Sequence, residues 1–146
     1  MKDMMLYFEW ANDPAVRQNS INKEPIALED HIEWFTRSIG NEETQFLIFD
    51  EGGKNIGQLR IDLDKERDKA IINFSIDAGQ RGKGYGTKML LIAYKFYLTL
   101  NLKKIFMGYV QAENKASSKA FEKAGFQLQS DSKIIQGEPY LVYKIK

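Results

Sequence analysis

Four glycines lie within the eight residues from Gly79 to Gly86, between an apolar run that ends at Ile76 and a segment with leucines at helical spacing. A strand before this loop and a helix after it are therefore predicted. The first N–H groups of a helix have no partner within it, and the helix dipole adds partial positive charge there. Glycine allows close backbone approach, and Arg81 and Lys83 add charge. The loop is predicted to bind an anion.

Two common phosphate-binding patterns do not fit this glycine loop. The dinucleotide pattern G-x-G-x-x-G fails because Gly82, Gly84 and Gly86 are spaced two apart. The Walker A pattern fails because Tyr85 stands where its lysine belongs, although Gly79 and Gly84 have the required separation. A solvent-exposed turn is the competing interpretation, and the preceding strand and following helix argue against it.

Length, charge and cysteine content narrow the class of protein. A chain of 146 residues with 43% hydrophobic content is expected to form a single domain over 1–146. A net charge of +1 favours neither nucleic acid nor membrane as a partner. The lack of cysteine excludes disulfides and thiolate metal sites, and no apolar segment approaches the roughly 18 residues that cross a bilayer. We expect a cytoplasmic protein without a metal ion.

Hydrophobic periodicity and turn residues predict the element order ααβββαβαββ. Helices are expected near residues 5–12, 26–39, 85–100 and 115–124, with a further helical turn after Pro14. Strands are expected near 44–50, 55–64, 69–77 and 103–110, followed by a hairpin over 126–145. Because this order combines hairpins with a crossover, it indicates a mixed α/β fold whose sheet is flanked by helices.

The residues from Arg81 to Gly86 match R/Q-x-x-G-x-G/A, the signature of the GNAT superfamily of N-acetyltransferases. The stretch NKASSKAFEKAGF, from Asn114 to Phe126, resembles a later strand-to-helix segment of the same superfamily. The resemblance covers about residues 45–126. It implies the GNAT fold, a mixed and mostly antiparallel sheet that is splayed between its two central parallel strands. These are the third and fourth strands here, with a thioester in the opening.

This resemblance implies acetyl-CoA as the co-substrate, with loop amides around the pyrophosphate and an asparagine on the pantetheine arm. It also implies that a backbone N–H near the end of the third strand stabilises the carbonyl oxygen. The cofactor-binding residues expected are Ile76, Arg81, Gly82, Lys83, Gly84, Tyr85, Gly86, Thr87 and Asn114.

The chemistry implied is attack of a neutral amine on the thioester, so a base or water must remove a proton. Many GNAT enzymes have a tyrosine, seven residues after the asparagine, that protonates the thiolate, and this chain has Phe121 there. Ser117, at a position where the branch acting on ribosomal-protein amino termini also has serine, is a candidate for contacting the sulfur. Its competing role is bonding to its own helix backbone. A water-mediated route is expected first, and the candidate bases after it are Asp62 and Glu113, ahead of Asp64, Asp77 and His31.

The stretch EWANDPAVRQNSINKEPIALEDHIEWF resembles the GNAT branch that acetylates nucleotide-linked amino sugars. Tryptophans offer flat faces to a sugar or base, and arginine can bind phosphate. Packing in the core is the competing interpretation for the aromatic residues and for the histidine of this stretch. The acceptor-binding residues expected are Trp10, Arg17, His31, Trp34 and Arg60.

The function expected is therefore acetylation of a primary amine on a small molecule, most specifically a nucleotide-activated amino sugar. An enzyme for amino-terminal amines of proteins and a non-catalytic acetyl-CoA sensor are the alternatives. Relatives usually have a strand before the first helix, and this chain begins almost within that helix. The sheet is expected to be one strand short, or to have that edge covered by a second copy in a homodimer.

Overall fold

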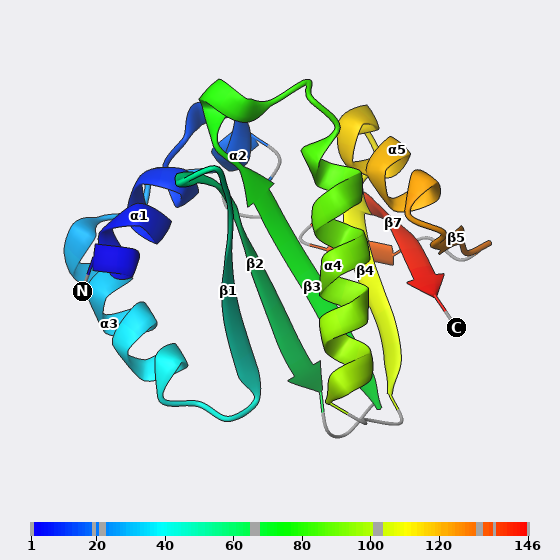
Figure 1. Ribbon diagram of the computed structural model, residues 1–146, viewed down its shortest axis with the longest axis horizontal. Helices are drawn as coiled ribbons and strands as arrows, with labels where there is room; N and C mark the ends of the chain where they lie inside the picture. The colour runs from blue at the N-terminus through cyan, green and yellow to red at the C-terminus, as the bar shows by residue number, and fades with distance from the viewer. Residues whose placement is uncertain are drawn as a thin grey trace.

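The computed structural model describes residues 2–18, 20, 23–64, 68–100, 104–130, 133–135 and 137–145. Within them, seven strands form one mixed sheet in the order β1-β2-β3-β4-β7-β5, and β6 also pairs with β7 (Figure 1). The predicted α/β class is confirmed. The elements are α1 (Lys2–Ala11), α2 (Pro14–Gln18), α3 (Leu28–Ile39), β1 (Thr44–Glu51), β2 (Lys54–Asp64), β3 (Lys69–Ile76), the 3₁₀ turn η1 (Ala78–Gln80), α4 (Tyr85–Thr99), β4 (Ile105–Gln111), α5 (Lys115–Lys123), β5 (Gln127–Leu128), β6 (Lys133–Ile135) and β7 (Glu138–Ile145).

The sheet opens between β3 and β4, as predicted. These strands are parallel and pair only over Lys69–Ile71 against Ile105–Met107. Beyond that point they diverge towards the glycine loop (Figure 1). The rings of Phe74 and Phe121 meet with their centroids 5.9 Å apart, so aromatic side chains occupy one side of the opening.

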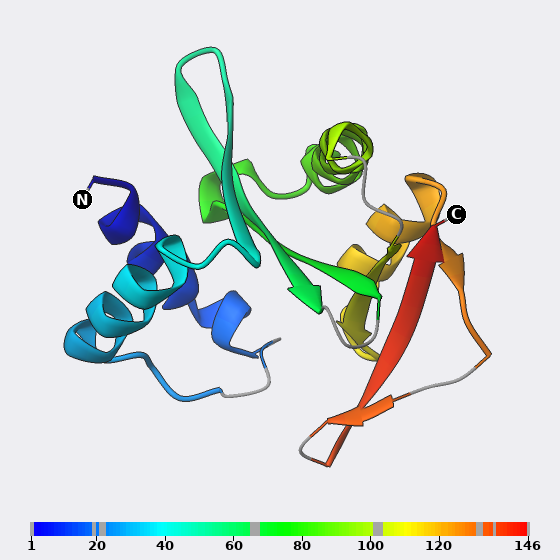
Figure 2. The same cartoon turned by 90° about the horizontal axis from the view of Figure 1, so that it is seen from below.

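Alternation along the strands gives the sheet two different faces. On β2, Leu59 and Ile61 are buried in the main core, whereas Arg60 and Asp62 point to the opposite face. Helix α4 covers the first face, and α1 to α3 lie on the other side (Figure 2). The β6–β7 hairpin projects on the same side as α1 to α3 (Figure 2).

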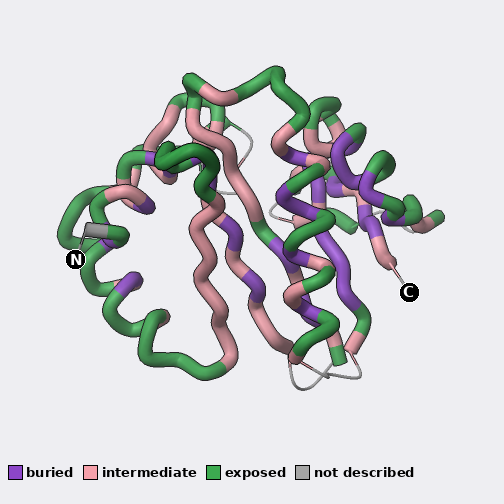
Figure 3. The backbone as a smooth tube through the Cα atoms, viewed as in Figure 1, coloured by how far each residue is buried: buried purple, intermediate pink, exposed green. Residues whose placement is uncertain are grey.

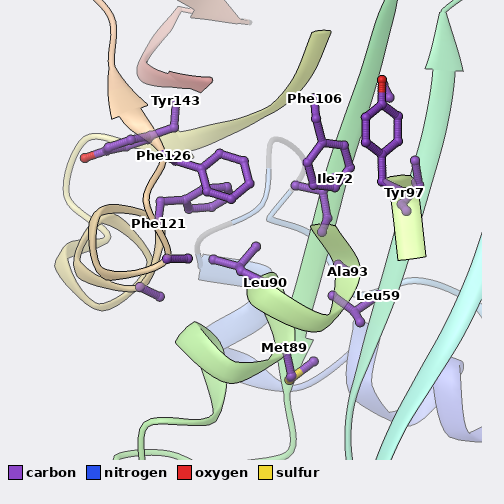
Figure 4. Close-up of a cluster of buried hydrophobic side chains, with 14 of the residues drawn as sticks. Leu59, Ile72, Met89, Leu90, Ala93, Tyr97, Phe106, Phe121, Phe126 and Tyr143 are labelled. Carbon is purple, nitrogen blue, oxygen red and sulfur yellow. The ribbon is translucent and has the colours of Figure 1, made fainter. Parts of the chain in front are cut away.

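The main core lies between α4, α5 and the sheet (Figure 4). Helix α4 buries residues three and four positions apart, which is the spacing of one helix face. Exposed residues alternate with these buried residues along α4 (Figure 3). The buried residues of α4 are Gly86, Met89, Leu90, Ala93 and Tyr97.

A second cluster fixes α1 and α3 to β1. Met4, Tyr7 and Phe35 are buried together against Phe46 and Ile48 of the strand. The Tyr7 hydroxyl lies within hydrogen-bond distance of two backbone carbonyl oxygens, 2.8 Å from the first and 3.2 Å from the second, on β1 and β2 respectively. This position fixes the helices as one wall beside the sheet.

The C-terminal region is more complex than the hairpin predicted for 126–145. Strand β7 pairs with β4 along one edge, while its other edge pairs with β6 near its start and with β5 near its end. The eight residues of β7 are long enough for both short partners. The helical turn expected after Pro14 is α2. Lys103, where the fourth strand was expected to begin, lies outside the described residues.

Among the described residues no strand pairs with the outer edge of β1. A hollow of about 430 Å³ lies beside that edge, where Tyr7 of α1 and Phe35 of α3 face Phe46 and Ile48. The homodimer suggested for this edge remains a prediction.

Candidate active site

A cleft of about 1080 Å³ crosses the opening in the sheet. Its walls are α1 to α3 on one side and the β6–β7 hairpin on the other, and its floor is formed by β2, β3 and β4. The glycine loop and the first turns of α4 and α5 close one end. The predicted site residues that line it are Arg17, His31, Trp34, Arg60, Asp62, Ile76, Arg81, Gly82, Gly84, Tyr85, Gly86, Thr87, Asn114 and Ser117.

The glycine loop begins at Asp77, which directly follows β3. Its Oδ2 accepts a hydrogen bond from the N–H of Gly79 (3.1 Å) and so caps η1. Gly84 then precedes α4 with φ of 81°, and no side chain caps the helix. No side chain therefore competes for the first N–H groups of α4, and anion binding at this loop remains a prediction.

Gly86 has a different role from Gly84. A Cβ at position 86 would lie 3.2 Å from the Cβ of Ala120 and 3.5 Å from the ring of Phe74. Glycine therefore lets α4 approach α5 and β3 closely, which narrows the end of the cleft.

Backbone groups of β3 face the opening. The N–H of Asp77 bonds to the carbonyl of Ile56 on β2 (2.8 Å). Because neighbouring residues of a strand direct their backbone groups to opposite edges, the N–H of Ile76 points away from β2. That edge of β3 has no partner beyond Ile71 in the described pairing. The N–H of Ile76 thus faces the opening, and its role as donor to the carbonyl oxygen remains a prediction.

The two basic residues of the loop have different surroundings. Arg81 binds Asp13 through an Nη2–Oδ1 contact of 2.9 Å, which connects the loop to the α1–α2 turn. Burial raises the pKa of Asp13, but hydrogen bonds from Arg81 and from backbone N–H groups outweigh it, so this pKa is lowered overall. Lys83 is exposed, bonds to Gln80 (3.2 Å) and is not among the residues that line the cleft.

Asn114 caps α5 and also engages the candidate Ser117. Its Oδ1 accepts from the Ser117 N–H (3.3 Å), and its Nδ2 donates to the Ser117 Oγ (3.0 Å). Both side chains line the cleft. Ser117 therefore bonds to the cap of its own helix and also lines the cleft.

Phe121 belongs to the core. It is only 2% exposed, and its ring stacks on that of Tyr143 with centroids 5.4 Å apart. A Cβ on Gly108 would lie 2.4 Å from its Cζ, so the absence of a side chain on β4 makes room for the ring.

On the floor of the cleft Arg60 bonds to Asp62 (Nε–Oδ2, 3.0 Å), and its guanidinium carbon lies 5.4 Å from the centre of the Trp34 ring. The ion pair is partly exposed. Glu113, the other carboxylate proposed as base, is exposed and is not among the lining residues. The structure therefore brings Asp62 to the cleft and leaves Glu113 outside it.

Trp10 and Arg17, which were expected to bind the acceptor, both make hydrogen bonds within the protein. Trp10 is 4% exposed, is not among the lining residues, and donates to Asp77. Arg17 lines the cleft and donates to the carbonyls of Ala11 (2.7 Å) and Glu24 (3.2 Å). Burial lowers the pKa of Arg17.

His31 is 2% exposed, and its Nε2–H donates to the carbonyl of Met4 (2.9 Å). Its ring packs against those of Phe8 and Trp34. This environment fits the interpretation that His31 packs in the protein interior, although the residue is also among those that line the cleft.

Sequence reasoning missed a group of polar residues on the cleft face of β2, β3, β4 and β7. These residues alternate with core residues along their strands, so the period-two pattern was the signal that could have found them. Tyr140 differs from the others because its hydroxyl is buried and has no hydrogen-bond partner among the described residues. The group comprises Gln58, Asn73, Ser75, Tyr109, Gln111 and Tyr140.

Solved structures of acetyltransferases share this architecture. Spermidine N-acetyltransferase from Vibrio cholerae, in complex with CoA and spermine, aligns over 99% of this chain and 89% of its own, with a TM-score of 0.84 and 18% identity. The aminoglycoside acetyltransferase AAC(6')-Ib, in complex with ribostamycin and coenzyme A, aligns over 98% of this chain and 88% of its own, with a TM-score of 0.83 and 20% identity. At these identities the likeness shows a common fold.

Sequence comparison shows the family. YwnH of Bacillus subtilis, provisionally named a phosphinothricin acetyltransferase, is 30% identical over 118 residues, which are 77% of this chain and 70% of YwnH. The sequence profile of the acetyltransferase (GNAT) domain matches residues 1–127. No described helix is long and apolar enough to span a membrane. The chain therefore belongs to the GNAT family of acetyltransferases and is an acyltransferase enzyme.

Proposed function

We propose that this enzyme transfers the acetyl group of acetyl-CoA to the primary amine of a small molecule that carries negative charge. A nucleotide-activated amino sugar is the specific candidate. The observation that carries this proposal is the charge of the cleft, whose described lining has more cations than carboxylates. The cations are Arg17, Arg60, Arg81, Lys119 and Lys123, and the carboxylates are Asp30 and Asp62.

Acetyl-CoA fits the glycine-loop end of the cleft. The free N–H groups at the start of α4 suit the pyrophosphate, and Arg81 adds a cation beside them. The unpaired edge of β3 offers hydrogen bonds to the amides of the pantetheine arm, which would bring the thioester to the N–H of Ile76. Coenzyme A is also present in the solved structures of the spermidine and aminoglycoside enzymes.

The acceptor then occupies the floor between α3 and the β6–β7 hairpin. Trp34 offers an aromatic face to a sugar or base, and Arg60 beside it offers a guanidinium to a phosphate or carboxylate. Asp62 is held next to Arg60 and can receive the amine proton through water. A polyamine would instead require carboxylates in excess along the floor.

The test is CoA release from acetyl-CoA with a panel of amines. It compares UDP- and dTDP-amino sugars with phosphinothricin, spermidine, an aminoglycoside and amino-terminal peptides. Turnover is expected with the nucleotide sugars. Preference for spermidine or the aminoglycoside contradicts the charge argument, and preference for peptides selects the amino-terminal alternative. Tight acetyl-CoA binding without any turnover selects the sensor.

The variant Arg60→Gln tests the acceptor wall directly. It is expected to raise KM for a negatively charged acceptor about tenfold or more, because a charge-assisted hydrogen bond is lost. The matched control is Arg37→Gln, since Arg37 is an exposed residue of α3 that is not among those lining the cleft. Equal effects of the two variants would contradict a specific role for Arg60.

A further inference from the structure

The CoA thiolate that leaves in acyl transfer needs a proton, and the side chain at position 121 cannot give one. Phe121 is buried between the rings of Tyr143 and Phe126, and its tip rests against Gly108. The same packing leaves little space for a hydroxyl at the ring tip. Another donor must therefore be sought among groups that line the cleft.

Two tyrosines of β7 point to opposite faces of the sheet. Tyr143 faces α5, where its hydroxyl donates to Oε1 of Glu122 (3.0 Å). Tyr140 is three residues away and so lies on the other face, where it lines the cleft opposite Gln111. Gln111 ends β4, and its carbonyl accepts from the N–H of Asn114, the cap of α5. Tyr140 is thus positioned beside the splayed end of β4.

The environment of Tyr140 is unusual for a phenol. The residue is 4% exposed, and its hydroxyl has no hydrogen-bond partner among the described residues. Buried polar groups are nearly always paired in native proteins, because an unpaired one loses its bonds to water without replacement. An unpaired hydroxyl in the wall of a cleft is therefore suited to a partner that arrives with the substrates. Burial, with a smaller effect of Glu138, raises the pKa of Tyr140, so the phenol keeps its proton at neutral pH.

We propose that Tyr140 is the side-chain acid of acyl transfer and protonates the CoA sulfur as the thioester breaks. This inference rests on the proposed function. The amine nitrogen forms a bond to the carbonyl carbon, and the electron pair of the C–S bond passes to sulfur. Sulfur takes the proton of the Tyr140 hydroxyl, and the proton lost by the nitrogen returns to the tyrosinate through water. The products are the amide and the free thiol of CoA.

The experiment compares Tyr140→Phe with Tyr143→Phe in the full chain. Tyr143 is the matched control because it is a buried tyrosine of the same strand whose hydroxyl faces α5, and it is not among the residues that line the cleft. With the best acceptor of the panel, Tyr140→Phe is expected to lower kcat about 100-fold, with little change in acceptor KM. The fall of kcat at high pH should also disappear in this variant. Tyr143→Phe should keep kcat near the wild-type value.

Stability gives a second readout that separates catalysis from packing. Because the Tyr140 hydroxyl has no hydrogen-bond partner among the described residues, its removal should leave the melting temperature unchanged or raise it. A lower melting temperature would show a structural bond and overturn the proposal. So would an unchanged kcat, a rise in KM alone, or a larger kcat loss in Tyr143→Phe.

The two proposals fail in different ways. A wild-type protein that acetylates no amine of the panel overturns the proposed function and the role of Tyr140 together. An active wild type with an equally active Tyr140→Phe variant overturns the role of Tyr140 alone.

Discussion

The indole N–H of Trp10 donates a hydrogen bond to Oδ1 of Asp77 (2.9 Å), so α1 is joined directly to the residue that begins the glycine loop. The other carboxylate oxygen of Asp77 accepts from Gly79 within the loop. Trp10 is buried beside Tyr7 rather than exposed to the acceptor. Its structural influence is therefore on the glycine loop at one end of the cleft.

The Trp10→Phe variant is expected to weaken both folding and acetyl-CoA binding. Removing the indole N–H leaves a partly buried carboxylate oxygen without this donor, which costs about 1–3 kcal/mol of unfolding free energy. The loop then loses its anchor on α1, so acetyl-CoA affinity measured by calorimetry should fall. Trp34→Phe is the control, because Trp34 lines the acceptor side. Loss of stability with unchanged acetyl-CoA affinity would contradict this role of Trp10.

Gly84→Ala should reduce acetyl-CoA binding more than it reduces stability. Gly84 has φ of 81°, and no atom lies within 4 Å of an added Cβ, so the folding cost is backbone strain of about 1–2 kcal/mol. The same strain would turn the first N–H groups of α4 away from the ligand.

Gly53→Ala is the control for Gly84→Ala, since Gly53 has φ of 79° and equally open surroundings in the β1–β2 turn. Both variants should lose similar unfolding free energy in urea, and only Gly84→Ala should lose affinity in calorimetry. Similar affinities in the two variants would count against an anion site at this loop.

The strand–loop–helix unit around the glycines was predictable because its signals are local. Positive φ favours glycine, and apolar spacing distinguishes the strand from the helix that follows. The same reasoning located the cap at Asn114, whereas the opening between the third and fourth strands was expected from the resemblance to the GNAT superfamily. Local patterns could not show that two short strands of the 126–145 region, β5 and β6, pair with the longer β7, because long-range pairing depends on which edges remain free.

The acceptor side was less predictable for a related reason. Residue type suggested that Trp10 and Trp34 have similar roles, yet the fold buries Trp10 under the loop and leaves Trp34 at the cleft. Tyr140 was overlooked because nothing in its neighbouring sequence shows that its hydroxyl is buried without a partner in the described part of the chain. Burial and pairing emerge only when distant strands meet.

The Asp13–Arg81 ion pair should make stability depend on pH in the acid range. The pKa of Asp13 is lowered in the folded protein from its ordinary 3.8, so the pair stabilises the fold above that value. This contribution is lost as pH falls through the folded pKa. Asp13→Asn should therefore be less stable than wild type at neutral pH and equally stable at about pH 2. Urea titrations at the two pH values make the comparison, and a difference that persists in acid would contradict it.

The contact between Gly108 and Phe121 predicts a measurable coupling. An alanine Cβ at position 108 would lie 2.4 Å from Cζ and 2.7 Å from Cε1 of the ring, so Gly108→Ala should cost about 1–3 kcal/mol of unfolding free energy through overpacking. Phe121→Leu alone should cost a similar amount, because it opens a cavity beside Tyr143.

In the double variant the shorter side chain makes room for the new methyl group. Chemical denaturation should therefore show a double variant more stable than the sum of the single effects by about 0.5 kcal/mol or more. Strict additivity would mean that β4 moves away from α5 instead, and acetyl-CoA affinity should then fall in Gly108→Ala as the opening between β3 and β4 changes.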